Sequence, residues 1–239
     1  MRIAIVSDIH GNRTAFGAVL SDLREISPDL IFHGGDLADG GPGGAEIIDQ
    51  IRALGWPGVA GNTDEMLFRP ESLAEFAAAS PGFRSLLPLL EEMAAATREA
   101  LGEERLDWLR NLPRMQMRRE VALVHASPES LWRSPMPEAS DADLAAEYSQ
   151  LRSPVVVYGH IHRPYIRQIA GMTIANSGSV GLPHDGDRRA GYLLLEHSRP
   201  EIRRVAYDVD RELKALAQSG RPHASWIAKI LESARPQMP

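Results

Sequence analysis

The chain has no cysteine among its 239 residues. This absence excludes a disulfide framework and thiolate metal sites, so the ligands of a bound metal would be His, Asp, Asn or Glu. No apolar run approaches the roughly 18–20 residues of a membrane-spanning helix, which predicts a protein without a transmembrane segment. The first residues, MRIAIVSD, lack the long apolar core of a secretory signal. We therefore expect a cytoplasmic protein.

An excess of basic residues is also missing. The chain has 26 Lys and Arg against 32 Asp and Glu, so its formal net charge is −6. This balance argues against an extended surface for binding nucleic acid. The hydrophobic content of 44% is ordinary for a globular protein, and the length suffices for a substantial core.

The first sixty residues alternate apolar runs with amphipathic stretches. Runs at 2–8, 29–36 and 56–62 predict buried strands. After the first run, Asn12 has the side chain of an N-cap, and apolar residues recur at helical spacing from Ala15 to Ile26. Such an alternation predicts a parallel sheet with crossover helices.

The rest of the chain divides into helical and strand-rich parts. Residues 65–112 are rich in Ala, Leu and Glu and predict helices broken at Pro81, Pro88 and Gly102. Strands return as back-to-back runs with short turns, and the last thirty residues predict helix. The apolar face with Trp226 and Ile230 either docks on a sheet or serves a homo-oligomer. We expect one α/β domain over residues 1–239, with two sheets, outer helices and a helical excursion at 65–112.

Residues able to bind metal follow five of the apolar runs. The motifs are SDIH, GGD, GN, VHAS and GHIH, which contribute Asp8, His10, Asp36, Asn62, His125, His160 and His162. Ligands of open α/β sheets bind beyond the carboxyl ends of the strands, so these seven side chains are expected to converge. Any one of them has an ordinary alternative, such as a helix cap or turn, but seven matching positions favour a common site.

Seven ligands exceed the needs of one ion and fit two ions that share a carboxylate. Asp36 is the natural bridge, because it follows a Gly-Gly turn and offers two oxygens. Mixed imidazole and carboxylate ligands suit manganese, iron, zinc or cobalt better than calcium or magnesium. Two such ions about 3.5–4 Å apart would favour in-line displacement at phosphorus.

The full set of motifs resembles the calcineurin-like metallophosphoesterases over nearly the whole chain. The segments DIHGN, GDLADGGP, AGNTDE and NSGSVGLPHDGD are similar to the bacterial phosphodiesterase-like branch that includes diadenosine tetraphosphate hydrolases. The resemblance implies a four-layer α/β/β/α sandwich of two mixed sheets. It also implies a bridging hydroxide as nucleophile and the following ligand sets: Asp8, His10, Asp36 and His162 for one ion, and Asp36, Asn62, His125 and His160 for the other.

The activity implied is hydrolysis of phosphate esters or anhydrides in a small phosphorylated substrate. A phosphodiesterase or dinucleoside polyphosphate hydrolase comes first, and a phosphomonoesterase or protein phosphatase second. The alternative from another functional class is a non-catalytic binding scaffold on the same fold, similar to the retromer subunit of this family. The complete ligand set favours the enzyme.

One residue departs from the family pattern. The chain has Gly61-Asn62-Thr63-Asp64, where the family usually has His in the third position, near the leaving group. A threonine cannot act as an acid near neutral pH. We therefore expect substrates whose leaving group needs little protonation, such as phosphoanhydrides or aryl esters.

Three further residues are candidates for contact with substrate. His184, in the loop GLPHDGD, is a candidate general acid, a phosphate contact or an exposed loop histidine. Asn12 and Arg13 lie at a helix N-terminus, where backbone N–H groups favour an anion and Arg13 has the side chain to bind a phosphate. The alternative for this pair is a plain cap followed by a solvated arginine.

Overall fold

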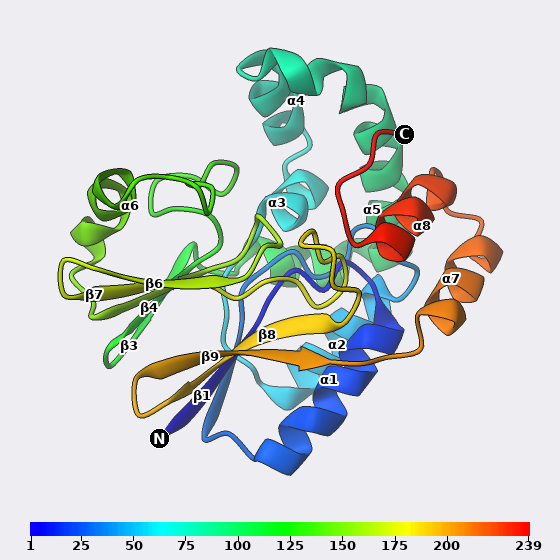
Figure 1. The fold of residues 1–239 in the computed structure, drawn as a ribbon. Helices are drawn as coiled ribbons and strands as arrows, with labels where there is room; N and C mark the ends of the chain where they lie inside the picture. The colour runs from blue at the N-terminus through cyan, green and yellow to red at the C-terminus, as the bar shows by residue number, and fades with distance from the viewer.

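The computed structural model describes residues 1–239, in which two mixed β-sheets lie between helices (Figure 1). The first sheet has the order β2-β1-β8-β9, with strands Leu30–His33, Arg2–Val6, Ala190–Glu196 and Arg199–Val205. The second has the order β3-β4-β5-β7-β6, with strands Met115–Arg118, Val121–Val124, Val155–Tyr158, Met172–Asn176 and Tyr165–Ile169. The first sheet has one parallel pair, β2 and β1, at its edge, and its other pairs are antiparallel. In the second sheet the parallel pairs lie at the centre, and an antiparallel strand extends it on each side.

Consecutive residues of the central strands face different cores. In β1, Ile3 and Ile5 join the buried cluster between the sheets, whereas Ala4 and Val6 face α1 (Arg13–Ile26) and α2 (Gly44–Leu54). The valines of β5 divide in the same way between the inter-sheet core and α6 (Asp141–Tyr148). Strands buried on both faces have nearly continuous apolar sequences, which is why these runs were recognisable. The layer order is α/β/β/α, and the predicted fold class is confirmed.

The segment after α2 is helical, as the sequence predicted. It forms α3 (Asn62–Phe68), α4 (Glu71–Ala78), the 3₁₀ helix η1 (Pro81–Leu86) and α5 (Leu87–Arg110). Pro81 begins η1, Pro88 lies in the first turn of α5, and Gly102 interrupts α5 with a φ of 68°. The three residues therefore act where their backbone preferences predict breaks. That residues 1–239 form a single domain stays a prediction.

Two elements differ from the sequence-based expectation. The predicted strand at 56–62 is wrong, because only one bridge, between Gly58 and His33, forms there. Pro57 has no N–H for a ladder, and the N–H of Ala60 bonds instead to the carbonyl of Pro113. Helix α6 was not expected, although Ser140 caps it by accepting from the N–H of Asp143.

The C-terminal helices pack beside the helical segment. Helices α7 (Val209–Gln218) and α8 (Ala224–Ser233) place Leu216, Ile227 and Ile230 in a buried cluster with Met93 of α5 and Leu182. The apolar face of α8 therefore packs within the chain. None of the helices combines the length and the apolar character that crossing a membrane requires.

Candidate metal centre

The structure brings all seven predicted ligands together at one end of the two sheets. Loops after β1, β2, β4 and β5 carry six of them, and Asn62 begins α3. Four of the seven, Asp8, His10, Asp36 and His162, are buried and each offers a ligand atom within 4.8 Å of the others. Residues more than 150 positions apart thus share one site, as the strand-end argument predicted.

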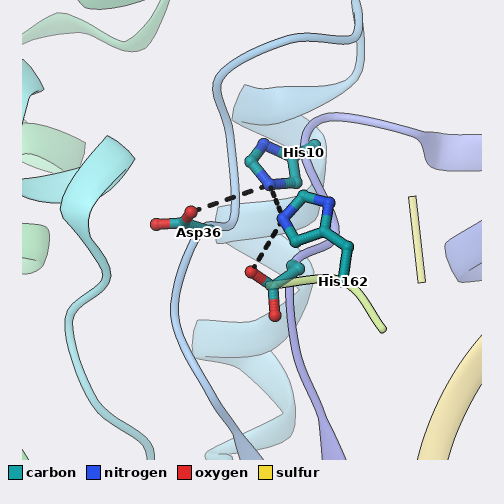
Figure 2. Close-up of side chains that lie close together, drawn as sticks. His10, Asp36 and His162 are labelled. Carbon is teal, nitrogen blue, oxygen red and sulfur yellow. Dashed lines mark hydrogen bonds and ion pairs between the residues drawn. The ribbon is translucent and has the colours of Figure 1, made fainter. Parts of the chain in front are cut away.

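The first group of candidate ligands consists of Asp8, His10, Asp36 and His162. Figure 2 shows His10, Asp36 and His162 facing one another. The Nε2 atoms of His10 and His162 lie 3.1 Å apart, and Nε2 of His162 lies 3.1 Å from Oδ1 of Asp8. Oδ2 of Asp36 lies 3.6 Å from Nε2 of His10. Two imidazole nitrogens and two carboxylates that face one another are a donor set that fits a divalent transition metal.

The second group lies on the other side of Asp36. Oδ1 of Asn62 is 2.9 Å from Nε2 of His125 and 2.8 Å from Nδ1 of His160. Nε2 of His125 is 3.5 Å from Oδ1 of Asp36. The two oxygens of Asp36 therefore face different groups of ligands, which is the geometry required of a bridging carboxylate.

Backbone carbonyls hold the far nitrogen of three ligand rings. Nδ1 of His10 lies 2.8 Å from the carbonyl of Asp39, Nδ1 of His125 lies 2.8 Å from that of Gly34, and Nδ1 of His162 lies 2.6 Å from that of Leu182. A carbonyl only accepts, so each Nδ1 carries the proton. When such a ring is neutral, its Nε2 lone pair is available to a metal, as in most histidine metal sites.

Five of the seven candidate ligands have left-handed backbone conformations. The φ angles of Asp8, His10, Asp36, His160 and His162 are 55°, 50°, 55°, 66° and 55°. Such conformations are uncommon outside glycine and cluster at functional sites, where the surrounding structure enforces them. Here they occur in the loops that directly follow β1, β2 and β5.

Gly159 allows the loop after β5 to approach the first metal motif. A Cβ added to Gly159 would lie 2.3 Å from Oδ2 of Asp8 and 2.3 Å from Oγ of Ser7. The close approach lets the N–H of His160 donate to Oδ1 of Asp8 at 3.1 Å. A side chain at position 159 would separate the two loops.

Buried charges set the protonation of these side chains. Burial by itself lowers the pKa of His125, but the Asp36 carboxylate outweighs it and raises the pKa to about 10. Burial would raise the pKa of Asp36, yet His125 holds it well below its usual range. Burial, together with His125, lowers the pKa of His160 to about 4. His125 and Asp36 thus form a buried ion pair that a metal must replace.

Asp64 positions the loops of the centre and had no role assigned from the sequence. Its carboxylate accepts from the backbone N–H groups of Asp36, Leu37 and Gly61 at 2.8, 3.0 and 2.9 Å. The three bonds tie the loop after β2 to the start of α3. The signal for this role was its place two residues after Asn62 in the motif.

Two serines position Asp8 in a similar way. The Ser7 hydroxyl donates to Oδ2 of Asp8 at 2.5 Å, and the Ser179 hydroxyl donates to its backbone carbonyl at 2.7 Å. Ser179 belongs to the segment NSGSVG, and the backbone N–H of Leu182 donates to its hydroxyl at 2.8 Å. This segment therefore supports the first metal motif, although Ser179 lies 171 positions after Asp8 in the sequence.

The candidate substrate residues Asn12 and Arg13 lie at the start of α1. Asn12 accepts from the N–H of Ala15 and donates to the carbonyl of Gly181 and the hydroxyl of Tyr207, so its amide is fully bonded. The side chain of Arg13 is 61% exposed and lies 3.3 Å from Glu46. These contacts show a cap and a surface ion pair, and contact with substrate stays a prediction.

His184, the candidate acid, lies beside the first group of ligands. Its ring centroid is 4.4 Å from that of His162, and its Nε2 is buried without a hydrogen-bond partner. Burial, reinforced by His162, lowers the pKa of His184 to about 2. The ring is therefore neutral near neutral pH, and a role as acid stays a prediction.

Comparison with known proteins places this geometry in a family. Residues 1–199 match the model of the Calcineurin-like phosphoesterase superfamily domain. An uncharacterised protein of Methanocaldococcus jannaschii is 28% identical over 252 residues, which cover 96% of each chain. A symmetrical bis(5'-nucleosyl)-tetraphosphatase of Cronobacter sakazakii is 30% identical over 184 residues, covering 72% of this chain but only 60% of that enzyme.

Solved structures agree with this placement. A metallophosphoesterase from Sphaerobacter thermophilus has a TM-score of 0.79 at 25% identity, covering 98% of this chain and 100% of that one. A hypothetical protein from Pyrococcus horikoshii OT3 has a TM-score of 0.83 at 18% identity over 96% and 97% of the two chains, which shows the fold alone. The chain belongs to the calcineurin-like phosphoesterase superfamily and is a phosphoester hydrolase.

Proposed function

We propose that the protein uses two divalent metal ions to hydrolyse phosphate esters or anhydrides in small phosphorylated molecules. The observation that carries the proposal is the position of Asp36 between two ligand groups. One of its oxygens lies 3.6 Å from Nε2 of His10, and the other lies 3.5 Å from Nε2 of His125. Asp8, His10 and His162 would complete one site, and Asn62, His125 and His160 the other.

The donor atoms favour manganese, iron or zinc, because imidazole nitrogens are combined with carboxylate and amide oxygens. Two such ions would lower the pKa of a bound water and neutralise the phosphoryl oxygens during in-line displacement. The chain's own contribution is to hold the imidazole lone pairs inward and the Asp36 carboxylate between the groups. Because these side chains are buried and held by hydrogen bonds, their donor atoms are already gathered at one place before the ions bind.

Within this activity, we place phosphodiesters and dinucleoside polyphosphates first. The tetraphosphatase of Cronobacter sakazakii supports this order, although the match spans only 60% of that enzyme. Phosphomonoesters or phosphoproteins are the second choice. A scaffold without activity is disfavoured, because a scaffold needs neither seven ligands nor the hydrogen bonds that orient them. A cytoplasmic location and a homo-oligomer stay predictions.

The test combines metal analysis with turnover. The protein, purified and loaded with manganese, is compared with its Asp36→Asn variant on bis-nitrophenyl phosphate, nitrophenyl phosphate and diadenosine tetraphosphate. We expect two ions per chain and turnover of at least one substrate. The variant should retain at most one tightly bound ion and lose roughly 10³-fold in kcat or more, because the neutral amide is a poor bridge. Two bound ions without any turnover would favour the scaffold, and full activity with one ion would refute the dimetal centre.

A further inference from the structure

A cleft of about 380 Å³ opens beside the first group of candidate ligands, and the proposed function does not yet assign it a role. His10 and His162 form part of its wall, so a phosphoryl group bound at the metals would have its organic part directed there. The volume falls within the range of about 300–1,000 Å³ that is common for small-molecule sites.

Apolar side chains from the helical segment and from the C-terminal part of the chain form much of the remaining wall of this cleft. Phe83 and Leu86 come from η1, Leu90 from α5, and Trp226 and Ile230 from α8. The segment after α8 completes it with residues 236–238, and in Figure 1 this segment runs back alongside α5. The Trp226 indole donates to the carbonyl of Gln237 at 2.8 Å, which holds this segment in place.

The charge of the lining selects among phosphorylated ligands. Neither Lys nor Arg lines the cleft, and Asp39 is the only carboxylate. Additional phosphates would therefore meet no cation there, since phosphate sites in proteins are built from Arg, Lys or backbone N–H groups. Flat aromatic side chains, Phe83 and Trp226, instead offer surfaces on which an uncharged ring stacks.

Two polar atoms in this apolar cleft have no partner. The Oγ1 of Thr63 and the Nε2 of His184 are both buried without a hydrogen bond, and both residues line the cleft beside the ligands. Leaving a buried polar group unpaired is costly, so each atom is suited to a polar atom of a ligand. An aromatic group with a polar edge would meet both the stacking surfaces and these atoms.

We propose that this cleft binds the organic part of the substrate, and that this part is a flat, uncharged aromatic group such as a nucleobase or a phenol. The proposal rests on the proposed hydrolase function and narrows it. A phosphoester with one such group fits the cleft better than a long chain of phosphates. It also gives the departure at Thr63 a structural role, because a threonine leaves the wall of the cleft uncharged.

The test measures binding of phosphonates, whose C–P bond is not hydrolysed. The manganese-loaded protein is titrated calorimetrically with methylphosphonate, 1-naphthylphosphonate and the phosphonate analogue of adenosine monophosphate. We expect at least one aromatic phosphonate to bind about tenfold or more tightly than methylphosphonate, because burial of an aromatic ring adds to the same metal contact. The two aromatic ligands distinguish an aryl from a nucleoside preference.

A pair of variants locates the effect. Leu86→Arg places a cation in the cleft, whereas Ser85→Arg adds the same charge at the exposed neighbouring residue outside it. In Leu86→Arg, the aromatic phosphonates should bind about as weakly as methylphosphonate. In Ser85→Arg, they should still bind about tenfold more tightly. The proposal for the cleft would be refuted if the unmodified protein bound all three phosphonates equally, or if Leu86→Arg left the aromatic preference unchanged. Either result would leave the proposed metal-dependent hydrolysis intact. Binding of none of them by protein with two bound ions would refute the hydrolase itself, and this proposal with it.

Discussion

Gly61 lies against the carboxylate of Asp36 so closely that a Cβ added to Gly61 would stand 2.0 Å from Oδ1. The backbone of Gly61 is not in the left-handed region, since its φ is −103°. The position therefore excludes side chains by contact alone. The carboxylate that we propose as the bridge therefore depends on a residue that has no side chain of its own.

Gly61→Ala is expected to displace Asp36 and impair both ligand groups. We expect a loss of about 10²-fold in kcat/KM, because a shift of about 1 Å in a positioned group has this effect. Metal analysis should also show fewer ions per chain. Gly17→Ala, in the middle of α1 with no atom within 4 Å of the added Cβ, is the matched control and should keep full activity. Normal metal content in Gly61→Ala would contradict the bridging role.

Asp64→Asn is expected to weaken metal binding without removing a ligand. The amide can accept from fewer of the three N–H groups of Asp36, Leu37 and Gly61, so the two loops lose their common anchor. Loss of such an orienting partner typically costs about 10–100-fold in metal affinity. The manganese dissociation constant measures the effect. Asp107→Asn, at a surface carboxylate that is 60% exposed, should leave the constant unchanged.

Thr63→His tests the missing acid. The backbone N–H of Thr63 donates to Oδ1 of Asp36 at 2.9 Å, and its side chain lines the cleft beside the ligands. An imidazole there would be placed to protonate a leaving group, an effect worth roughly 10²–10⁴-fold for poor leaving groups. Turnover of alkyl phosphoesters should therefore rise more than that of nitrophenyl esters. An equal change in both classes would show that proton donation is not limiting.

Metal binding is expected to release protons near neutral pH. The pKa of His125 is raised to about 10 by Asp36 against the effect of burial, and that of His162 is raised by Asp8 in the same way. A histidine must lose its extra proton before it can bind a metal, so each ion displaces a proton and the apparent affinity should rise with pH from 7 toward 10. Calorimetry in buffers of different ionisation enthalpy should give one to two protons released per chain. Asp36→Asn should release fewer, and no release at pH 7 would contradict the ion pair.

His33 is expected to make the fold sensitive to acid. Both its ring nitrogens are buried without partners, and burial lowers the pKa from the ordinary value of 6.5 to about 3. Between these values the unfolded chain takes up a proton that the folded chain does not. The free energy of unfolding is therefore not reduced by His33 above pH 6.5. It falls by roughly 1.4 kcal/mol per pH unit as the pH decreases from 6.5 toward 3.

The difference between the native protein and His33→Phe isolates this effect. Denaturant unfolding at several pH values should give a shallower acid dependence for His33→Phe. His197→Asn, at an exposed histidine, should follow the native curve. Parallel curves for His33→Phe and the native protein would show that His33 accepts a proton while folded.

Convergence of the ligands was predictable because four of the five motifs, all but the one with Asn62, follow a buried strand. Strand period and burial are local properties, and parallel strands bring their carboxyl ends to one edge. The prediction of a strand at 56–62 was wrong because it used the same apolar signal. It is apolar enough for a strand, but Pro57 limits it to a single bridge at Gly58.

The supporting contacts were not predictable, because they join residues with no common local pattern. Ser179 bonds to Asp8 across 171 positions, and Trp226 and Phe83 share a cleft although neither is near a metal motif. Asn12 shows the difference within one residue. Its role as N-cap of α1 followed from the sequence, but its bonds to Gly181 and Tyr207 did not.

The sequence by itself determined which donor atoms the centre contains and which strand ends carry them, because these depend on residue type and on local periodicity. Only the tertiary structure decided that the two oxygens of Asp36 face His10 and His125 separately, and that the Asp36 carboxylate raises the pKa of His125. The direction of a carboxylate and the charge of a buried ring depend on the distances between distant segments. Those distances exist only once both sheets and their helices have packed.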